Sequence, residues 1–231
     1  MNPPPSQAET REPQYQCCLD LQRKQGLAQF GLMSNYMWRN DPRHLAFLMS
    51  RYKFVAKMLS GRQRVLEIGC ADAFATRVVL QEVRRLTAID FDPVFIQDAQ
   101  RRMDSRWPFD CRVHDMVKKP LDATFDAAYA LDVLEHIPPA KENRFIGNIA
   151  KSLTEQGVLI IGLPSLASQA YASEASKQGH VNCKDHQGLK QLLGAFFHNV
   201  FLFSMNDEVV HTGFYPMAQY LLGLACSKRK R

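Results

Sequence analysis

Seven acidic residues fall at or just past the ends of short apolar runs in the middle of the chain. They are Glu67, Asp72, Asp90, Asp92, Asp115, Asp132 and Glu135, and no lysine stands among them. Carboxylates stabilise a positive charge nearby and repel phosphate groups. A site lined by these residues therefore suits a cofactor that has a ribose, an ammonium and a sulfonium better than one that carries a pyrophosphate.

The spacing of Gly69 and Asp90 narrows the class of cofactor. Asp90 stands 21 residues after Gly69, which is about the distance at which an acidic side chain binds the hydroxyls of a ribose. Of a possible Gly-x-Gly-x-x-Gly only Gly69 is present, so the dinucleotide fingerprint is excluded. The sequence predicts a nucleoside cofactor.

The apolar runs that carry these residues predict an α/β fold. Strands are expected over residues 65–68, 86–90, 111–113, 125–131 and 158–161, with room for helices between them. Such alternation predicts a doubly wound, mostly parallel sheet whose two faces are covered by helices. After a helix over 189–197, strands over 200–203 and 220–226 are expected to form an antiparallel pair, which makes seven strands in all.

Four segments are expected along the chain. Residues 1–30 are rich in Pro, Gln and charge and predict a mobile leader. Residues 31–61 predict a helical cap: Asp41-Pro42 begins a helix, and apolar residues recur at helical spacing up to Ser60-Gly61. Residues 62–227 form the cofactor-binding domain, and 228–231 form a basic tail.

Composition excludes several classes of protein. The 231 residues are 46% apolar, which excludes wholesale disorder, and they contain no apolar run of 18 and no signal peptide, so a cytoplasmic protein without a membrane span is expected. The net charge is +6, and residues 228–231 supply four of these positive charges. The rest of the chain is nearly balanced, so nucleic acid is not the favoured partner. Six cysteines without a Cys-x-x-Cys pair predict reduced thiols and no zinc knuckle.

Four motifs in order resemble those of the class I S-adenosylmethionine-dependent methyltransferases, in their small-molecule, ubiquinone-type branch. The segments are VLEIGCA at 65–71, AIDFDP at 88–93, HDM at 114–116 and FDAAYALDVLEHIP at 125–138. The resemblance implies a Rossmann-like fold and S-adenosylmethionine as cofactor. The chain departs from the family at Ala71 and Ala73, where glycine is frequent.

The same resemblance implies the cofactor-binding residues. Glu67 and Gly69 would line the methionine part, Asp90 would bind the ribose hydroxyls, Phe91 would lie against the adenine and Asp115 would accept from its exocyclic amine. The remaining expected contacts are with Ala71, Met116 and Leu131.

Methyl transfer depends first on aligning acceptor and methyl group, and a hydroxyl acceptor must also lose a proton. His136 is the first candidate for the base, followed by Asp132 and His211. Asp132-x-x-Glu135-His136 also resembles the Glu-x-x-Glu-His pattern that binds a divalent ion in some family members. Because only three ligands are visible and the first is one methylene shorter, no metal is expected.

The expected reaction is methyl transfer to a polar small molecule, most simply at a hydroxyl of a sugar, a sugar nucleotide or a phenolic metabolite. Polar and aromatic residues in 164–185 and 206–216 are expected to choose the acceptor. Two alternatives stay open. One is an RNA methyltransferase, which the basic tail and the metal-like set of Asp132, Glu135 and His136 would favour, and the other is a binding or scaffold protein without turnover, which the two alanines would favour.

Overall fold

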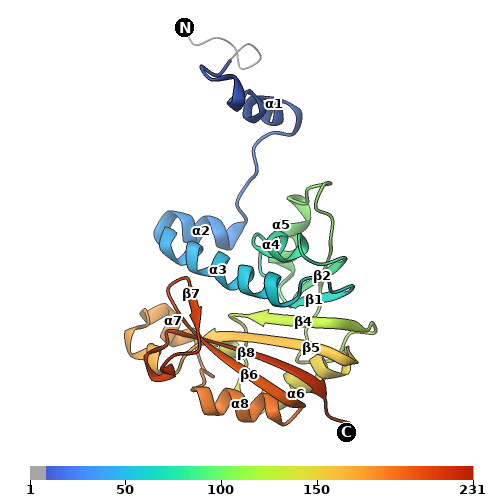
Figure 1. Ribbon diagram of the computed structural model, residues 1–231, viewed down its shortest axis with the longest axis vertical. Helices are drawn as coiled ribbons and strands as arrows, with labels where there is room; N and C mark the ends of the chain where they lie inside the picture. Colours follow the sequence, from blue (N-terminus) through green and yellow to red (C-terminus); the bar gives the residue numbers. More distant parts are fainter. Residues whose placement is uncertain (1–8, 231) are drawn as a thin grey trace. The chain divides into compact units, whose positions relative to one another are not determined.

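The computed structural model describes residues 9–230, apart from the side chain of Ala175 (Figure 1). The chain divides into two compact units between Phe30 and Gly31. In the first unit a turn of 3-10 helix, Pro13–Tyr15, leads into α1 (Gln16–Gln25), which ends at Gly26 with a φ of 72°. The predicted leader therefore contains a helix that its composition does not indicate, and residues 1–8 of it lie outside the described residues.

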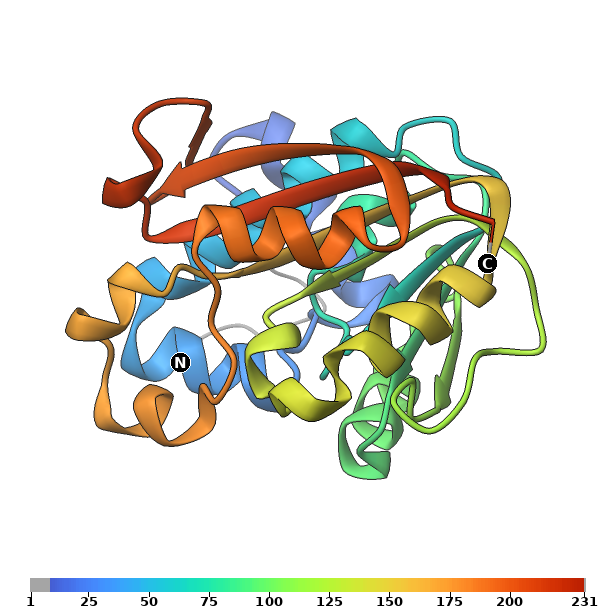
Figure 2. The same cartoon turned by 90° about the horizontal axis from the view of Figure 1, so that it is seen from below.

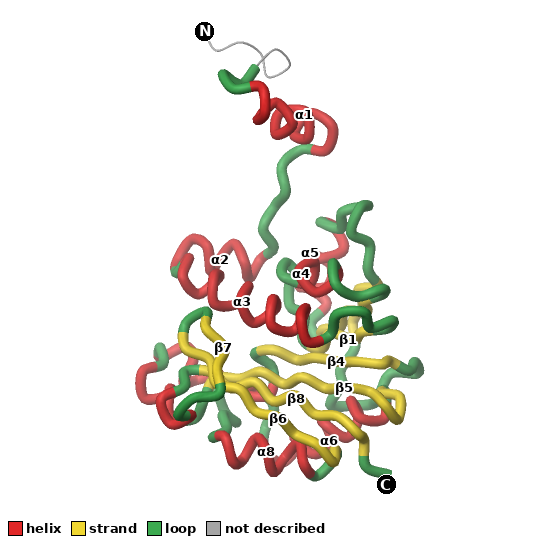
Figure 3. The backbone as a smooth tube through the Cα atoms, in the orientation of Figure 1, coloured by secondary structure: helices red, strands yellow, loops and turns green. Residues whose placement is uncertain are grey.

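The second unit is built on one mixed sheet of eight strands, drawn in yellow in Figure 3. The strand order is β3-β2-β1-β4-β5-β8-β6-β7. The strands are β1 (Val65–Ile68), β2 (Leu86–Asp90), β3 (Asp110–Val113), β4 (Phe125–Leu131), β5 (Leu153–Pro164), β6 (Phe197–Asn206), β7 (Val209–His211) and β8 (Tyr220–Lys228).

The first five strands are parallel, and β8 runs antiparallel between β5 and β6. The predicted doubly wound architecture and the antiparallel C-terminal pair are confirmed. The predicted count of seven strands is one too low, because β7 pairs with the end of β6 as an edge hairpin. A strand of three residues is too short for the alternation of apolar and polar side chains that marks a strand in a sequence.

Helices cover both faces of the sheet, as Figure 2 shows for α6 and α8 on one face. One core cluster joins the sheet to Phe145, Ile146 and Ile149 of α6 (Pro139–Lys151) and to Leu189 and Leu193 of α8 (His186–Gly194). The other core cluster joins the sheet to α3 (Pro42–Met58), α4 (Thr76–Leu80) and α5 (Pro93–Arg101). The remaining short helices are η2 (Leu134–His136), η3 (Ala167–Tyr171), α7 (Glu174–Gly179) and η4 (Tyr215–Met217).

The cap consists of two helices, because α2 (Leu32–Asn40) precedes α3. Asp41 separates them with a φ of −150° and a ψ of 82°. A residue before proline is disfavoured in the helical region, so Pro42 both ends α2 and begins α3. The aromatic residues Tyr36 and Trp38 lie on α2.

The C-terminal basic residues are partly bound to the domain. Strand β8 continues to Lys228, whose Nζ donates to the carbonyl of Leu153 at 2.8 Å and lies 3.4 Å from Glu155. The amide of Arg229 donates to the carbonyl of Phe196 at 2.8 Å. Two of the four expected tail charges thus contact the sheet and its flanking elements. Among the described helices, none combines the length and the apolarity that crossing a membrane requires.

Candidate functional site

The loop after β1 has an unusual backbone. Gly69, Ala71 and Ala73 have φ values of 73°, 45° and 51°, which places every second residue in the left-handed region. Side chains disfavour this region, so glycine is the usual residue there. Ala71 and Ala73, the two alanines noted in the sequence, therefore adopt a backbone conformation that glycine adopts more readily.

Gly69 brings the ends of β1 and β4 together. Its amide donates to the carbonyl of Ile89 at 2.8 Å, and a Cβ at this position would lie 2.3 Å from Cγ2 of Val133. No side chain fits there unless Val133 moves. The glycine is thus required both by its positive φ and by its close contact with the segment after β4.

Glu67 is buried, at 1% exposure, and both its carboxylate oxygens are bound. Oε1 accepts from the hydroxyl of Tyr52 on α3 at 2.7 Å, and Oε2 accepts from the hydroxyl of Thr76 on α4 at 2.6 Å. Burial raises the pKa of Glu67 from 4.5 to about 7, although the two hydroxyls act in the opposite direction. The structure places this residue between three elements as a buried bridge, and its contact with a methionine moiety stays a prediction.

Asp90 is the last residue of β2, and Phe91 follows it; both lie beside the same loop. Oδ2 of Asp90 accepts from the amide of Ala71 and Oδ1 accepts from the amide of Asp92, both at 2.9 Å. Asp90 therefore holds the loop after β1 against the loop after β2. Phe91 is 73% exposed, which is unusual for a large apolar side chain and leaves its ring available to stack on a planar base.

The side chains of Asp115, Met116 and Leu131 differ in their exposure. Oδ1 of Asp115 accepts from the amide of Val117 at 2.9 Å, and its side chain is 30% exposed. Met116 and Leu131 are 3% and 5% exposed, and both belong to the core clusters. Asp115 thus has an accessible carboxylate, whereas the side chains of the other two residues pack in the core.

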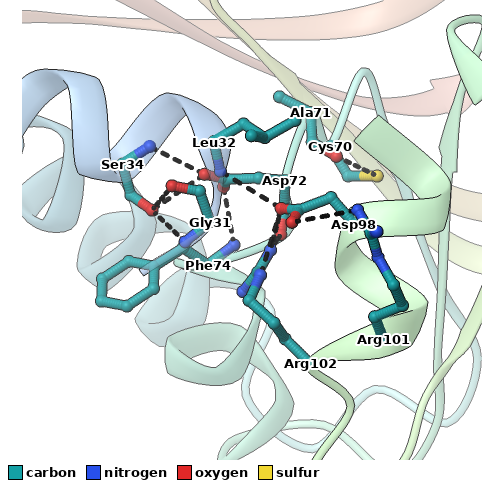
Figure 4. A network of polar contacts seen from close by, with 10 residues as sticks. All are labelled: Gly31, Leu32, Ser34, Cys70, Ala71, Asp72, Phe74, Asp98, Arg101 and Arg102. Atoms are coloured by element: carbon teal, nitrogen blue, oxygen red, sulfur yellow. Dashed lines mark hydrogen bonds and ion pairs between the residues drawn. The ribbon is translucent and has the colours of Figure 1, made fainter. Parts of the chain in front are cut away.

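Asp72 binds the start of the cap and is not a free acidic residue of the rim (Figure 4). Its Oδ2 accepts from the amide and the hydroxyl of Ser34 on α2 at 2.7 and 2.8 Å. The amide of Leu32 donates to Asp98 of α5 at 3.1 Å. These two carboxylates satisfy amides at the beginning of α2, where a helix has unpaired donors and favours negative charge. Hydrogen bonds therefore join the loop after β1 and α5 to the start of the cap.

Asp132 follows β4 with a φ of 57°. Its two carboxylate oxygens accept from Nη1 of Arg51 on α3 at 2.9 and 2.8 Å. The Arg51 guanidinium also lies 3.9 Å above the centre of the Tyr220 ring. The sequence analysis did not select Arg51, although it lies on the same helix face as Leu48 and Val55, where a charged residue has to have a partner.

Glu135 is the second carboxyl group at the end of β4 and, unlike Asp132, it is buried. It is 1% exposed, and within residues 9–230 its Oε2 has no hydrogen-bond partner. Burial, followed by the charge of Asp132, raises the pKa of Glu135 well above its usual value. Burial and Glu135 also raise the pKa of Cys183 to about 11. An unpaired buried carboxyl oxygen is costly, so it indicates a site for a ligand or an ion.

His136 has His180 as its neighbour. The two ring centroids are 5.2 Å apart, and one ligand atom from each ring and from Glu135 lies within 4.8 Å of the others. Asp132 is not in this group because it binds Arg51. The structure therefore combines Glu135 and His136 with a histidine that stands 44 positions further along the chain.

His211 lies elsewhere in the sheet. It belongs to β7, which is the fourth strand from β4 in the sheet order. Its Nε2 is 2.8 Å from Oδ1 of Asn206, and its Nδ1 accepts from the amide of Gly213 at 3.0 Å. Both ring nitrogens are thus engaged in the β6–β7 hairpin. The structure does not group His211 with Asp132 and His136.

These features fit S-adenosylmethionine. The left-handed loop, the Asp90 carboxylate beside it and the exposed Phe91 and Asp115 lie at the carboxyl ends of β1, β2 and β3, where doubly wound sheets bind their ligands. The cofactor has an adenine, which suits an exposed aromatic ring, and a ribose and a positively charged end, which suit carboxylates.

Comparisons with known proteins agree with this geometry. Residues 66–161 match the family described as "Methyltransferase domain". Nodulation protein S of Rhizobium tropici is 29% identical over 117 residues, which are 50% of this chain and 47% of that protein. A "Probable S-adenosylmethionine-dependent methyltransferase" of Mycolicibacterium smegmatis is 26% identical over 116 residues, 49% of this chain and 42% of that protein. The chain thus spans less than half the length of these curated relatives.

Among solved structures, the N-methyltransferase NodS of Bradyrhizobium japonicum in complex with S-adenosyl-L-homocysteine has the same fold. It superposes with a TM-score of 0.61 and 22% identity, over 82% of this chain and 91% of that chain. The predicted fold is therefore confirmed. Over residues 66–161 the chain matches a methyltransferase domain, and its curated relatives include S-adenosylmethionine-dependent methyltransferases, which confirms the resemblance that the four motifs carry.

Proposed function

We propose that this protein is an enzyme that moves a methyl group from S-adenosylmethionine to a hydroxyl group of a polar small molecule. The observation that supports the first part, the use of S-adenosylmethionine, is the loop after β1: three alternate residues are left-handed, and Asp90 binds the amide of the middle one, Ala71. A backbone of this kind lets a ligand approach closely without contacting side chains. The accessible Phe91 and Asp115 beside it suit the adenine.

When bound, the cofactor supplies a methyl group on a sulfonium that an acceptor atom displaces in line. This chain contributes alignment, which is the largest expected source of acceleration for such a reaction. The ion pair of Arg51 with Asp132 ties α3 to the end of β4 and orients the acceptor side of the site. Asp132 is proposed as a positioning residue, because its carboxylate is bound to Arg51.

A hydroxyl acceptor also needs a group that takes up its proton. The polar atoms at the end of β4 that suit this step belong to Glu135, His136 and His180, which surround one point. His136 is the most exposed of the three, so its ring is the one that an acceptor reaches first. His211 is proposed to support the neighbouring hairpin and not to take part in proton transfer.

Two of the earlier alternatives lose support. The binding or scaffold protein was favoured by Ala71 and Ala73, and these residues adopt the backbone that glycine would adopt. The RNA methyltransferase was favoured by the basic tail and by the metal-like set of Asp132, Glu135 and His136. Lys228 and Arg229 are bound to the domain, and Asp132 pairs with Arg51 and does not join the other two.

A ligand-induced rise in melting temperature tests the cofactor. S-adenosylmethionine and S-adenosylhomocysteine should each raise the melting temperature, because a ligand that binds only the folded state stabilises it, and NAD should not. Binding of NAD without any response to the two sulfur nucleosides would contradict the assignment.

A panel of acceptors tests the second part of the proposal, which is the transfer of the methyl group to a hydroxyl group of a polar small molecule. The protein is incubated with S-adenosylmethionine labelled in the methyl group and with sugars, sugar nucleotides, phenols, primary amines or bulk RNA. We expect transfer to at least one hydroxyl compound and none to RNA. Transfer to amines alone would keep the methyltransferase and overturn the hydroxyl acceptor.

A further inference from the structure

The two edges of the sheet differ in how they are protected against pairing with another chain. The strand order places β3 at one edge, and β6 with the short β7 at the other (Figure 2). β3 has four residues, and its Asp110 and Arg112 form an ion pair at 3.3 Å. Proteins commonly prevent an edge strand from pairing by making it short and by placing charged side chains on it. The edge at β3 has both of these features.

The outer side of β6 is covered only near its end. β6 has ten residues, and within the part of the chain that the structure describes β7 pairs with the last three of them, Ser204 to Asn206. Residues 197–203, which we call the open edge, read FHNVFLF and contain no Lys, Arg, Asp, Glu, Pro or Gly. Aromatic and β-branched residues without charge favour strand pairing. The open edge therefore lacks the protection found at β3.

The hairpin of β6 and β7 shows which main-chain groups of β6 face outward. A hairpin with a two-residue turn closes on a hydrogen-bonded pair, which is here Asn206 and Val209. Hydrogen-bonded and non-hydrogen-bonded pairs alternate along an antiparallel ladder, so Ser204 also directs its N–H and C=O toward β7. Between them, the carbonyl of Met205 accepts from the amide of Gln219 at 3.2 Å on the opposite side. Residues with even numbers thus face outward.

This alternation continues along the open edge, because the register of β6 with β8 is unbroken from Asn199 to Met205. Val200 and Leu202 therefore each direct an N–H and a C=O outward, and no strand within residues 9–230 pairs with that side of them. Unpaired main-chain groups of this kind are a template for a further strand. The open edge thus offers donors and acceptors to an extended segment.

The side chains of the open edge add two features that a further strand would contact. Phe201 is 54% exposed, and it lies on the same face of the sheet as Phe203, whose ring packs edge-on against Phe54 of α3 at 5.1 Å. On the other face, Val200 borders a groove of about 530 Å³ between α8 and β6, which Gln191 also lines. An added strand would thus find an exposed aromatic ring on one face and an open groove on the other.

We propose that the open edge binds the same edge of a second copy of this chain, as an antiparallel pair centred on Phe201. In this register Val200 of one copy stands opposite Leu202 of the other, and the two residues exchange both main-chain hydrogen bonds. The two Phe201 residues form a non-hydrogen-bonded pair, in which the Cα atoms are only about 4.5 Å apart, so the rings cover each other. Leu202 of the second copy then points toward the groove beside Val200.

A second copy is the partner that these observations favour. The register centred on Phe201 satisfies the outward main-chain groups of both edges at once and covers both exposed rings. Because residues 197–203 carry no acidic or basic pair of like charges, two copies of the edge do not repel each other. A contact built around one pair of strands is small, so we expect a dimer that dissociates on dilution. The inference concerns association alone and does not depend on the proposed methyl transfer.

Sedimentation equilibrium of the full chain over a dilution series measures the association. We expect the mass to rise with concentration from 26.4 kDa toward twice that value. Phe201→Lys places two like charges at the centre of the pair and should raise the Kd of the dimer at least about tenfold, since buried aromatic residues at the centre of an interface dominate its affinity. Val113→Lys is the matched control, because Val113 is 51% exposed on β3 at the other edge, and it should associate like the wild type.

Hydrogen exchange of the wild type identifies the surface involved, and it holds even if Phe201→Lys fails to fold. The amides of Val200 and Leu202 should exchange more slowly at concentrations at which the dimer prevails than in the dilute monomer. The proposal is overturned if the wild type stays at 26.4 kDa at every concentration, if a folded Phe201→Lys associates as the wild type does, or if these two amides exchange equally fast in monomer and dimer.

Discussion

The carboxyl groups beside β1 and β2 differ from that of Glu135, the second of the two that follow β4, in how completely their neighbours bind them. Glu67 receives two hydroxyls, Asp72 receives the start of α2, and Asp90 receives two loop amides. Oε2 of Glu135, equally buried, receives no hydrogen bond within residues 9–230. The first region is thus complete without a ligand, whereas the second has unused bonding capacity.

This difference indicates a division of labour within one edge of the sheet. In the cofactor region the acidic side chains shape the backbone, and the exposed parts that remain for a ligand are the loop itself, Phe91 and Asp115. In the proposed acceptor region Asp132 is bound by Arg51, whereas Oε2 of Glu135 and the exposed ring of His136 are left available. Changes in the first region should therefore act through stability and cofactor affinity, and changes in the second through turnover.

The largest effect is expected at Gly69. Gly69→Ala should lower the free energy of unfolding by about 2–5 kcal/mol, because a left-handed alanine costs roughly 1–2 kcal/mol and the contact with Val133 adds about 1–3 kcal/mol. Chemical denaturation measures the loss. Gly61→Ala is the matched control, since its φ is 82° with no atom within 4 Å of the added Cβ, and it should show the first cost alone. Equal losses in both variants would refute the role of Val133.

The buried bridge at Glu67 should make stability depend on pH. Its pKa is 4.5 in the unfolded chain and about 7 in the folded protein, so the folded state holds the proton more tightly. Its stabilising contribution is complete below pH 4.5 and is lost as the pH rises through 7, by about 3 kcal/mol at most.

Urea unfolding at pH 5 and pH 8 measures this loss as the difference between the wild type and Glu67→Gln, which has no proton to release there. Glu208→Gln, in the exposed turn between β6 and β7, should keep the wild-type profile. If Glu67→Gln loses stability over this range as the wild type does, the titrating group is another residue.

Substitutions of Asp132 and Asp90 by asparagine compare the two regions directly. Asparagine tolerates the left-handed backbone of Asp132, so Asp132→Asn removes charge and keeps the loop. We expect kcat/KM for the acceptor to fall at least about tenfold, with the Kd for S-adenosylmethionine within a few-fold. Asp90→Asn should instead raise that Kd about tenfold or more. The NH₂ group of asparagine would face one of the two backbone N–H groups that Asp90 now accepts from, and two donors cannot bind each other. Calorimetry and steady-state kinetics separate the two, and a reversed pattern would contradict the division.

The sequence predicts the fold because the fold follows from local patterns, and the proposed cofactor region rests on the same patterns. Apolar runs that alternate with helices define the sheet, and Gly69 and Asp90 stand at fixed positions relative to its strands. The acceptor region depends on contacts between distant segments. His180 reaches Glu135 through main-chain bonds of the segment after α7, and Arg51 reaches Asp132 from the cap, so neither partnership has a spacing that could be recognised. Met116 and Leu131 stand in recognisable motifs, but their position in a motif does not reveal that their side chains are buried.

The smallest effect is expected at Ala71, which has a φ of 45° without being glycine. Ala71→Gly relieves backbone strain of about 1–2 kcal/mol but adds freedom to the unfolded chain worth roughly 0.4–1 kcal/mol, so stability should rise by about 0.5–1 kcal/mol. Ala172→Gly, at a φ of −70° in an ordinary extended conformation, should be destabilising instead. Thermal denaturation of the two variants measures the contrast. A loss of stability in both would mean that the Cβ of Ala71 makes contacts worth more than the strain it imposes, and the loop would then be held by packing as much as by Asp90.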